Sequence, residues 1–253
     1  MTVRELYEIL NQRFPTALSC TWDNDGLSCC PDGTREVRRV LITLDVTADA
    51  VERAISTRCD LILSHHPLIF KGLKAIDDES PIPSKVIKLI SNGIAVMSFH
   101  TRLDAVEGGV NDVLAEVLGL CEVTPFGEEA IGRIGTLPEE TSAEDFAKKV
   151  KAMLNAPVVQ LADAGCPVRR VAVLGGGGSD DVEAARAAGA DTYVSGELKY
   201  HQLTDAPEEG MNLITAGHFH TEFPVCAMLA QLIKSLDATV EVEIYENYNV
   251  KTI

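Results

Sequence analysis

Short apolar runs alternate with segments of helical periodicity along the whole chain. Helical spacing or helix-opening residues indicate helices at about residues 3–13, 48–57, 83–91, 108–118, 141–154, 180–188 and 218–235. Compact or alternating apolar runs indicate strands at about 37–46, 61–63, 94–99, 157–161, 169–174, 191–195, 212–215 and 238–245. This regular alternation predicts an α/β protein whose sheets are largely covered by helices.

Histidines and carboxylates stand where three of the expected strands end. They are His65 and His66, His100 and Asp104, and His218 and Glu222. Because ligands of α/β sheets gather beyond the carboxyl ends of strands, we expect these side chains to form a site. A His-His pair alone is also typical of an ordinary turn, but imidazole with carboxylate and without thiolate suits zinc, manganese or iron.

The spacing of these residues favours two ions over one. His65 and His66 are adjacent, and neighbouring side chains on extended backbone point in opposite directions, so each can serve a different ion. His218 and Glu222 lie on one face of a helical turn, whereas His220 points elsewhere. The donors exceed what one tetrahedral site needs and fit two ions about 3.5–4 Å apart. Sites with two such ions activate water for the hydrolysis of phosphate esters, amides or ring C–N bonds.

Composition narrows the range of partners. The formal net charge of −16 disfavours broad nucleic-acid binding, which relies on Lys and Arg. We expect no membrane span, because no apolar run is long enough, and no signal peptide at residues 1–14, and therefore a cytoplasmic protein. The seven cysteines form no zinc pattern and are expected to be reduced thiols.

Three other features are open to two interpretations. Trp22 lies in a polar loop and is expected to anchor that loop in the core. The tetraglycine segment 175–178 is expected to be a strand-to-helix turn, with a phosphate-binding loop as the alternative. His201, on an expected helix, is either structural or a proton donor beside the metal site.

The pattern restarts around residues 125–135, where Gly127, Gly132 and Gly135 indicate turns. We therefore expect an N-terminal half over 1–125 and a C-terminal half over 126–253. The last helix and strand, about 217–253, are expected to return and complete the metal site.

Several motifs together resemble the Nif-three-like (NGG-interacting-factor-three-like) family, often labelled GTP cyclohydrolase type-two homologues. They are Trp22-Asp-Asn-Asp-Gly-Leu27, Leu44-Asp-Val-Thr47, Ser64-His-His-Pro-Leu-Ile-Phe70, His100-Thr-Arg-Leu-Asp104, Gly108-Gly-Val-Asn-Asp112, Gly132-Arg-Ile-Gly135, Gly196-Glu-Leu-Lys-Tyr-His201 and Gly217-His-Phe-His-Thr-Glu222. The resemblance covers nearly the whole chain and matches the short form of the family.

The resemblance implies two α/β domains with mixed sheets covered by helices, a toroidal homohexamer, and a dinuclear centre of two divalent ions per chain. It places the metal ligands on His65, His66, Asp104, His218 and Glu222, with Glu222 as the bridge. His100 then becomes a neighbour of the ligands. Two departures are Arg102, where the family often has asparagine beside the Asp ligand, and the extra histidine His220.

Three functions follow as hypotheses. The first is a two-metal hydrolase of a small phosphorylated or nucleotide-like substrate, with His100 or His201 as proton carriers. The second is non-catalytic, namely metal storage or delivery or a hexameric interaction scaffold. The third, DNA clamping by a ring, is disfavoured by the negative charge.

Overall fold

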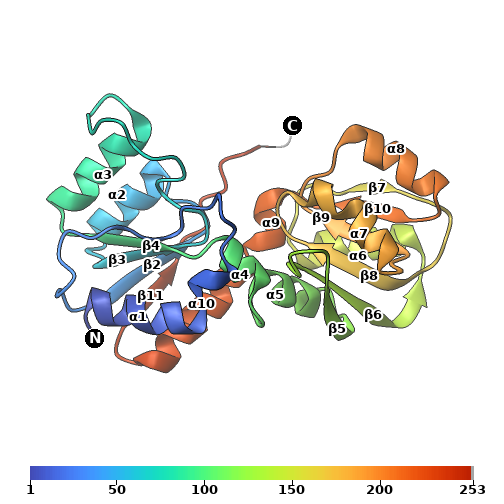
Figure 1. The fold of residues 1–253 in the computed structure, drawn as a ribbon, viewed down its shortest axis with the longest axis horizontal. Helices are drawn as coiled ribbons and strands as arrows, with labels where there is room; N and C mark the ends of the chain where they lie inside the picture. Colours follow the sequence, from blue (N-terminus) through green and yellow to red (C-terminus); the bar gives the residue numbers. More distant parts are fainter. Residues whose placement is uncertain (252–253) are drawn as a thin grey trace. The chain divides into compact units, whose positions relative to one another are not determined.

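The computed structural model describes residues 1–251, and the chain forms two compact units. The first unit is Met1–Leu103 with Cys226–Asn249, and the second is built on Asp104–Val225. The sequence-based division lay at residue 125, whereas the observed one falls between Leu103 and Asp104. Figure 1 shows the elements of each unit.

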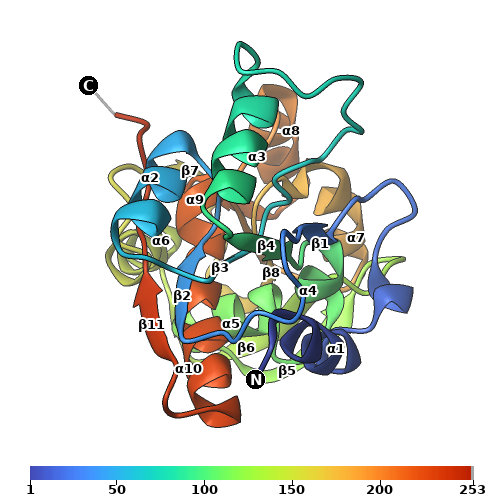
Figure 2. The ribbon, with the colours of Figure 1, turned by 90° about the vertical axis from the view of Figure 1, so that its left-hand side faces the viewer.

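The first unit contains one five-stranded mixed sheet in the order β1-β4-β3-β2-β11. Its elements are α1 (Val3–Arg13), a 3-10 turn (Thr16–Leu18), β1 (Gly26–Cys29), β2 (Arg39–Thr43), α2 (Ala48–Ser56), β3 (Leu61–Ser64), α3 (Pro81–Ser91), β4 (Ala95–Ser98), α10 (Val225–Leu236) and β11 (Glu241–Ile244). Strands β11, β2, β3 and β4 are parallel, and β1 pairs antiparallel with β4. Helices α2 and α3 cover one face, and α1 and α10 cover the other (Figures 1 and 2).

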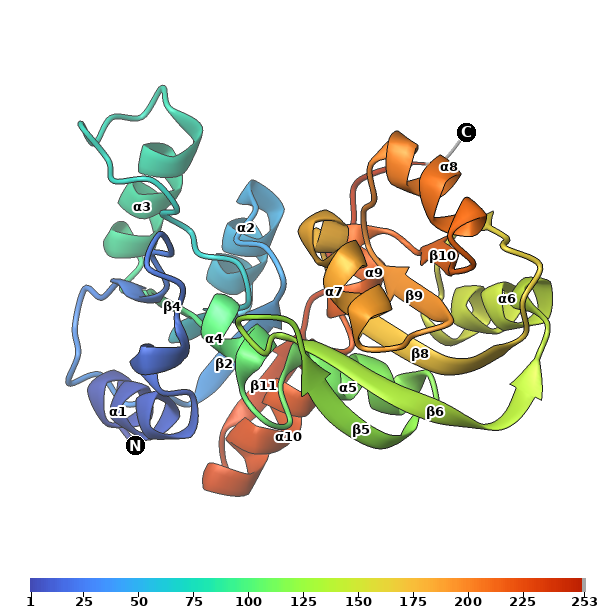
Figure 3. The ribbon, with the colours of Figure 1, turned by 45° about the vertical axis from the view of Figure 1, so that its right-hand side comes forward.

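The second unit contains one six-stranded mixed sheet in the order β5-β6-β8-β9-β10-β7 (Figure 3). Its elements are α5 (Val110–Val117), β5 (Cys121–Phe126), β6 (Gly132–Thr141), α6 (Ala143–Met153), β7 (Gln160–Ala162), β8 (Val168–Leu174), a 3-10 turn (Gly178–Asp181), α7 (Val182–Ala187), β9 (Thr192–Ser195), α8 (Tyr200–Glu208), β10 (Asn212–Thr215) and α9 (His218–Glu222). Strands β8, β9 and β10 are parallel. The short helix α4 (Thr101–Ala105) spans the boundary between the units.

Alternate residues of strand β8 pack into two different hydrophobic clusters, one on each face of the sheet of the second unit. Val171 and Val173 of β8 pack in the cluster that contains Phe146 of α6. Ala172 and Leu174 of the same strand pack in the cluster that contains Ala185 of α7. Because Val171–Leu174 of β8 are buried on both faces of the sheet, this part of the strand is a continuous apolar run, which is why its sequence is easy to recognise.

The α/β class with mixed, helix-covered sheets is confirmed, and so are most elements. Helix α1 begins at Val3 as predicted, and a Thr2–Glu5 capping box opens it. Helix α6 begins at Ala143, two residues later than predicted, because Ser142 rather than Thr141 accepts the hydrogen bond from the Asp145 N–H. The single helix expected over 218–235 is wrong as well. It is divided into α9 and α10, and Pro224, which has no N–H to continue a helix, lies between them.

Gly132 and Gly135 do not form turns, contrary to the prediction, but lie inside strand β6. A Cβ on Gly132 would collide with the ring of Phe126, and one on Gly135 would lie 2.8 Å from the carbonyl oxygen of Cys121. Both neighbours belong to β5, so the glycines allow the two strands to pack closely. Within residues 1–251, no helix is long and apolar enough to cross a membrane.

Candidate metal centre

Three histidines converge at the carboxyl ends of two neighbouring strands in the first unit. His65 and His66 follow β3, and His100 follows β4. These strands are parallel, with Ser64 paired with Ser98, so their ends meet at the same edge of the sheet. One ligand atom from each histidine lies within 4.8 Å of the others. The three histidines therefore lie together at the ends of strands β3 and β4, where the sequence predicts them.

Each of these histidines has its Nδ1 nitrogen bonded to an oxygen of the protein. His65 Nδ1 donates to the Phe99 carbonyl, and His66 Nδ1 lies 2.9 Å from Oδ1 of Asp45. His100 Nδ1 lies 2.9 Å from Oδ1 of Asp23. Metal-binding histidines almost always carry such an outer partner, which fixes the ring orientation and makes Nε2 the coordinating nitrogen. This arrangement fits divalent metal ligation.

Asp23 is held in its charged form beneath His100. Its side chain is fully buried. Burial alone raises the pKa of this carboxyl group, but hydrogen bonds from His100 and Thr101 outweigh that effect, and the pKa of Asp23 lies below its usual value. The carboxylate accepts bonds from the Thr101 N–H at 3.1 Å and from its hydroxyl at 2.7 Å. Asp23 therefore fixes both the position and the tautomer of His100.

The second unit carries its own group of oxygen and nitrogen donors around Glu222. His218 Nε2 lies 3.2 Å from Oε2 of Glu222, one helical turn away in α9. A carboxylate oxygen of Asp104 lies within 4.8 Å of a Glu222 oxygen. Glu222 is buried. Glu222 thus has a ligand-type side chain on either side, and the three residues are of the types that hold divalent ions.

This second group also lies at the carboxyl ends of parallel strands. Leu174 of β8 pairs with Ser195 of β9, and Ser195 pairs with Thr215 of β10. Helix α9 starts just after β10. Both units thus present metal-ligand residue types at the edge where α/β sheets commonly bind ligands.

A family model described as Duf34/NIF3 (NGG1p interacting factor 3) matches residues 1–250. The chain belongs to the NIF3 family. A Clostridium perfringens relative named GTP cyclohydrolase 1 type 2 homolog is 32% identical and covers 95% of each chain. The Schizosaccharomyces pombe Protein NIF3 homolog is 32% identical, covering 86% of this chain and 84% of that protein.

A solved structure supports the NIF3 fold. The Staphylococcus aureus hypothetical protein SA1388 aligns with a TM-score of 0.90 and 28% identity, over 100% of this chain and 99% of that chain. The resemblance inferred from the sequence motifs is therefore confirmed.

The tetraglycine segment of this NIF3 protein is a strand-to-helix turn, as expected, and it packs against the second group of ligands. Gly176 has a φ of +67°, and a Cβ there would collide with the Glu222 carboxylate and lie 3.0 Å from His218 Nε2. The Gly176 N–H donates to Oγ1 of Thr221 at 3.0 Å. Any side chain at position 176 would therefore enter the space of the Glu222 and His218 side chains, so only glycine fits there.

We expect Gly176→Ala to weaken metal binding by roughly ten- to 100-fold, the range found when groups that orient ligands are lost. The matched control is Gly177→Ala, because nothing lies within 4 Å of a Cβ at that position. The measurement is a metal titration followed by calorimetry. Equal affinities for the two variants would show that Gly176 does not shape the ligand group.

Among residues 1–251, neither His201 nor His220 belongs to these groups of ligand-type side chains. His201 is exposed on α8, and among the described residues it joins no cluster of ligand-type side chains. His220 is buried and its ring contacts Phe219. Trp22 was expected in the core, but this is wrong, since 60% of the residue is exposed. The guanidinium of Arg102 is directed into the first unit, as detailed in the Discussion.

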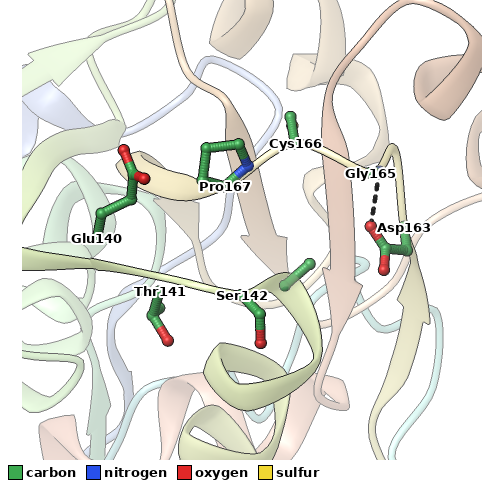
Figure 4. Close-up of a pocket in the computed structure, with 8 residues that line it drawn as sticks. Glu140, Thr141, Ser142, Asp163, Gly165, Cys166 and Pro167 are labelled. Atoms are coloured by element: carbon green, nitrogen blue, oxygen red, sulfur yellow. Dashed lines mark hydrogen bonds between the residues drawn. The ribbon is translucent and has the colours of Figure 1, made fainter.

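A separate pocket of the second unit offers no comparable chemistry. Figure 4 shows it between the end of β6, the start of α6 and the loop before β8. Its polar groups are engaged locally, since Ser142 caps α6 and Oδ1 of Asp163 accepts from the Gly165 N–H at 2.7 Å. No histidine lines this pocket, so sequence and geometry both favour the histidine and glutamate groups as the functional site.

Proposed function

We propose that this NIF3 protein binds two divalent metal ions per chain through His65, His66, Asp104, His218 and Glu222. The observation that carries the proposal is the pair of Nδ1 bonds made by His65 and His66, which orients both imidazoles as metal ligands. The second unit contributes the carboxylates, including the proposed bridge Glu222. The donor set of nitrogen and oxygen suits iron, zinc or manganese.

We further propose that the bound ions serve hydrolysis of a small phosphorylated or nucleotide-like substrate. When bound, such ions supply an acidified water and polarise a carbonyl or phosphoryl oxygen. The name of the Clostridium perfringens relative, GTP cyclohydrolase 1 type 2 homolog, supports hydrolysis of a ring bond in a nucleotide-like substrate.

Within this proposal, His100 moves protons. Its Nδ1 donates to the buried Asp23 carboxylate, so its Nε2 is the basic nitrogen of the ring and can take up or deliver a proton. His201, exposed on α8, is the second candidate for this role. A homohexamer in the cytoplasm remains part of the prediction from the family resemblance.

The test is a substrate screen with metal-loaded protein on phosphate esters, nucleoside triphosphates and cyclic amides, followed by phosphate release and mass spectrometry. We expect turnover that requires metal and falls at least 100-fold in His100→Ala, in line with loss of a general acid–base group. His100→Ala should retain its metal. A fully loaded protein with no turnover on this panel would instead favour metal storage or delivery, or an interaction scaffold.

A further inference from the structure

Two exposed aromatic rings stand beside His100 in the first unit. Trp22 is 60% exposed and Phe70 is 42% exposed, although both are large apolar side chains. Their ring centroids are 6.0 Å apart, and each lies 6.1 Å from the centroid of the His100 ring. The His100 ring in turn lies 5.3 Å from that of His65. The aromatic pair is thus continuous with the histidine cluster.

The loops that carry these rings are fixed by hydrogen bonds. Asp23, next to Trp22, is bonded to His100 and Thr101. The Asn24 amide donates to the Ile69 carbonyl, next to Phe70, at 2.5 Å. The two aromatic segments are therefore tied to the cluster and to each other. Two exposed aromatic rings that lie side by side form an apolar patch, and such patches mark candidate ligand-binding surfaces.

The arrangement of the two rings suits a flat ligand. Their planes meet at 66°, so they form two walls of a corner rather than a stacked pair. A planar heterocycle can stack on one wall and meet the other edge to face, which is the favourable geometry for aromatic pairs. Stacking also needs no basic residue, which matters in a protein with a formal net charge of −16.

We infer that Trp22 and Phe70 bind the planar heterocyclic ring of the substrate, next to His100. This inference rests on the proposed function and narrows its substrate class to compounds with an aromatic base, such as nucleotides. It also assigns a role to the Trp22 loop that the metal site does not explain.

The single tryptophan makes the inference directly measurable, because all tryptophan fluorescence of the protein comes from Trp22. The experiment titrates the metal-loaded full chain with AMP, GMP or UMP, and with ribose 5-phosphate as the probe that lacks a base. We expect saturable quenching by at least one nucleotide and none by ribose 5-phosphate. Phe70→Leu should weaken nucleotide binding roughly tenfold, the effect of removing one stacking ring.

Ile76→Ala is the matched control, because Ile76 is an exposed apolar residue of the loop that follows Phe70. It should bind nucleotides as the wild type does. Metal content is measured on every sample and should be unchanged in Phe70→Leu. A wild-type protein that holds no metal would contradict the proposed function. Nucleotide binding by Trp22 and Phe70 is judged on samples that contain metal.

Two results with loaded protein would overturn the inference. One is an absence of quenching by all three nucleotides. The other is equal nucleotide affinity of the wild type and Phe70→Leu. If, in addition, Phe70→Leu changed the molecular mass in solution, the aromatic pair would be assigned to contacts between copies of this chain instead.

Discussion

Glu222→Ala is expected to remove essentially all bound metal from the protein. The carboxylate is buried, lies 3.2 Å from His218 Nε2 and has an oxygen of Asp104 within 4.8 Å. As the proposed bridge it would contribute one oxygen to each ion, so its loss affects both. Glu222→Gln keeps the shape but lacks the charge, and is expected to retain at most a small part of the metal.

The measurement is metal content per chain by elemental mass spectrometry after reconstitution and gel filtration. Glu209→Ala is the control, because Glu209 is a surface carboxylate paired with Arg186. His65→Ala should lose both ions too if the two units serve one dinuclear centre. Loss of one ion in each variant would indicate two independent sites.

Arg102→Met is expected to lower the free energy of unfolding of the first unit by about 3–5 kcal/mol, the usual effect of breaking a buried ion pair. Arg102 is fully buried and donates to Asp25 at 2.8 Å, to the Asn11 side chain at 2.7 Å and to the Phe14 carbonyl at 3.0 Å. Its guanidinium also lies 4.6 Å from the centre of the Phe99 ring. Removing it leaves the Asp25 carboxylate buried without its cation.

Urea denaturation followed by Trp22 emission measures this effect, since Trp22 belongs to the first unit. Arg38→Met is the control, because the Arg38–Glu36 pair is exposed and such surface pairs contribute little to stability. The double variant Arg102→Met/Asp25→Asn should recover part of the lost stability, as it removes the unpaired charge. A loss below about 1 kcal/mol in Arg102→Met would show that this network does not stabilise the unit.

The sequence predicts where these candidate ligands lie in the fold, because the signal for each is local. His65, His66 and His100 each follow a short apolar run, and that run is a strand in the structure. Likewise, His218 and Glu222 have helical spacing and lie on one helix. Signals of this kind need no knowledge of distant parts of the chain.

The partners of these ligands could not be found in the same way, because they come from other loops. Asp45 follows β2 and contacts His66, while Asp23 precedes β1 and contacts His100. The sequence separations are 21 and 77 residues. Nothing in the sequence near His66 or His100 indicates which carboxylate will lie beside it.

The predictions for Gly135 and Trp22 are wrong for the same reason. The type of a residue does not show which distant part of the chain will pack against it. Gly135 was expected in a turn, but it lies in β6 because the β5 backbone approaches too closely for a side chain. Trp22 was expected in the core, but polar bonds of the neighbouring Asp23 and Asn24 hold its loop at the surface. Tertiary contacts decided both outcomes.

If this NIF3 protein binds two divalent ions per chain, as we propose, the untagged wild type should contain them in a fixed ratio to the protein. Elemental mass spectrometry after purification and reconstitution should give about two equivalents of iron, zinc or manganese, the number used by two-metal hydrolytic centres. A value near zero that reconstitution with these metals does not raise would contradict the proposal. The histidine and carboxylate groups would then be structural.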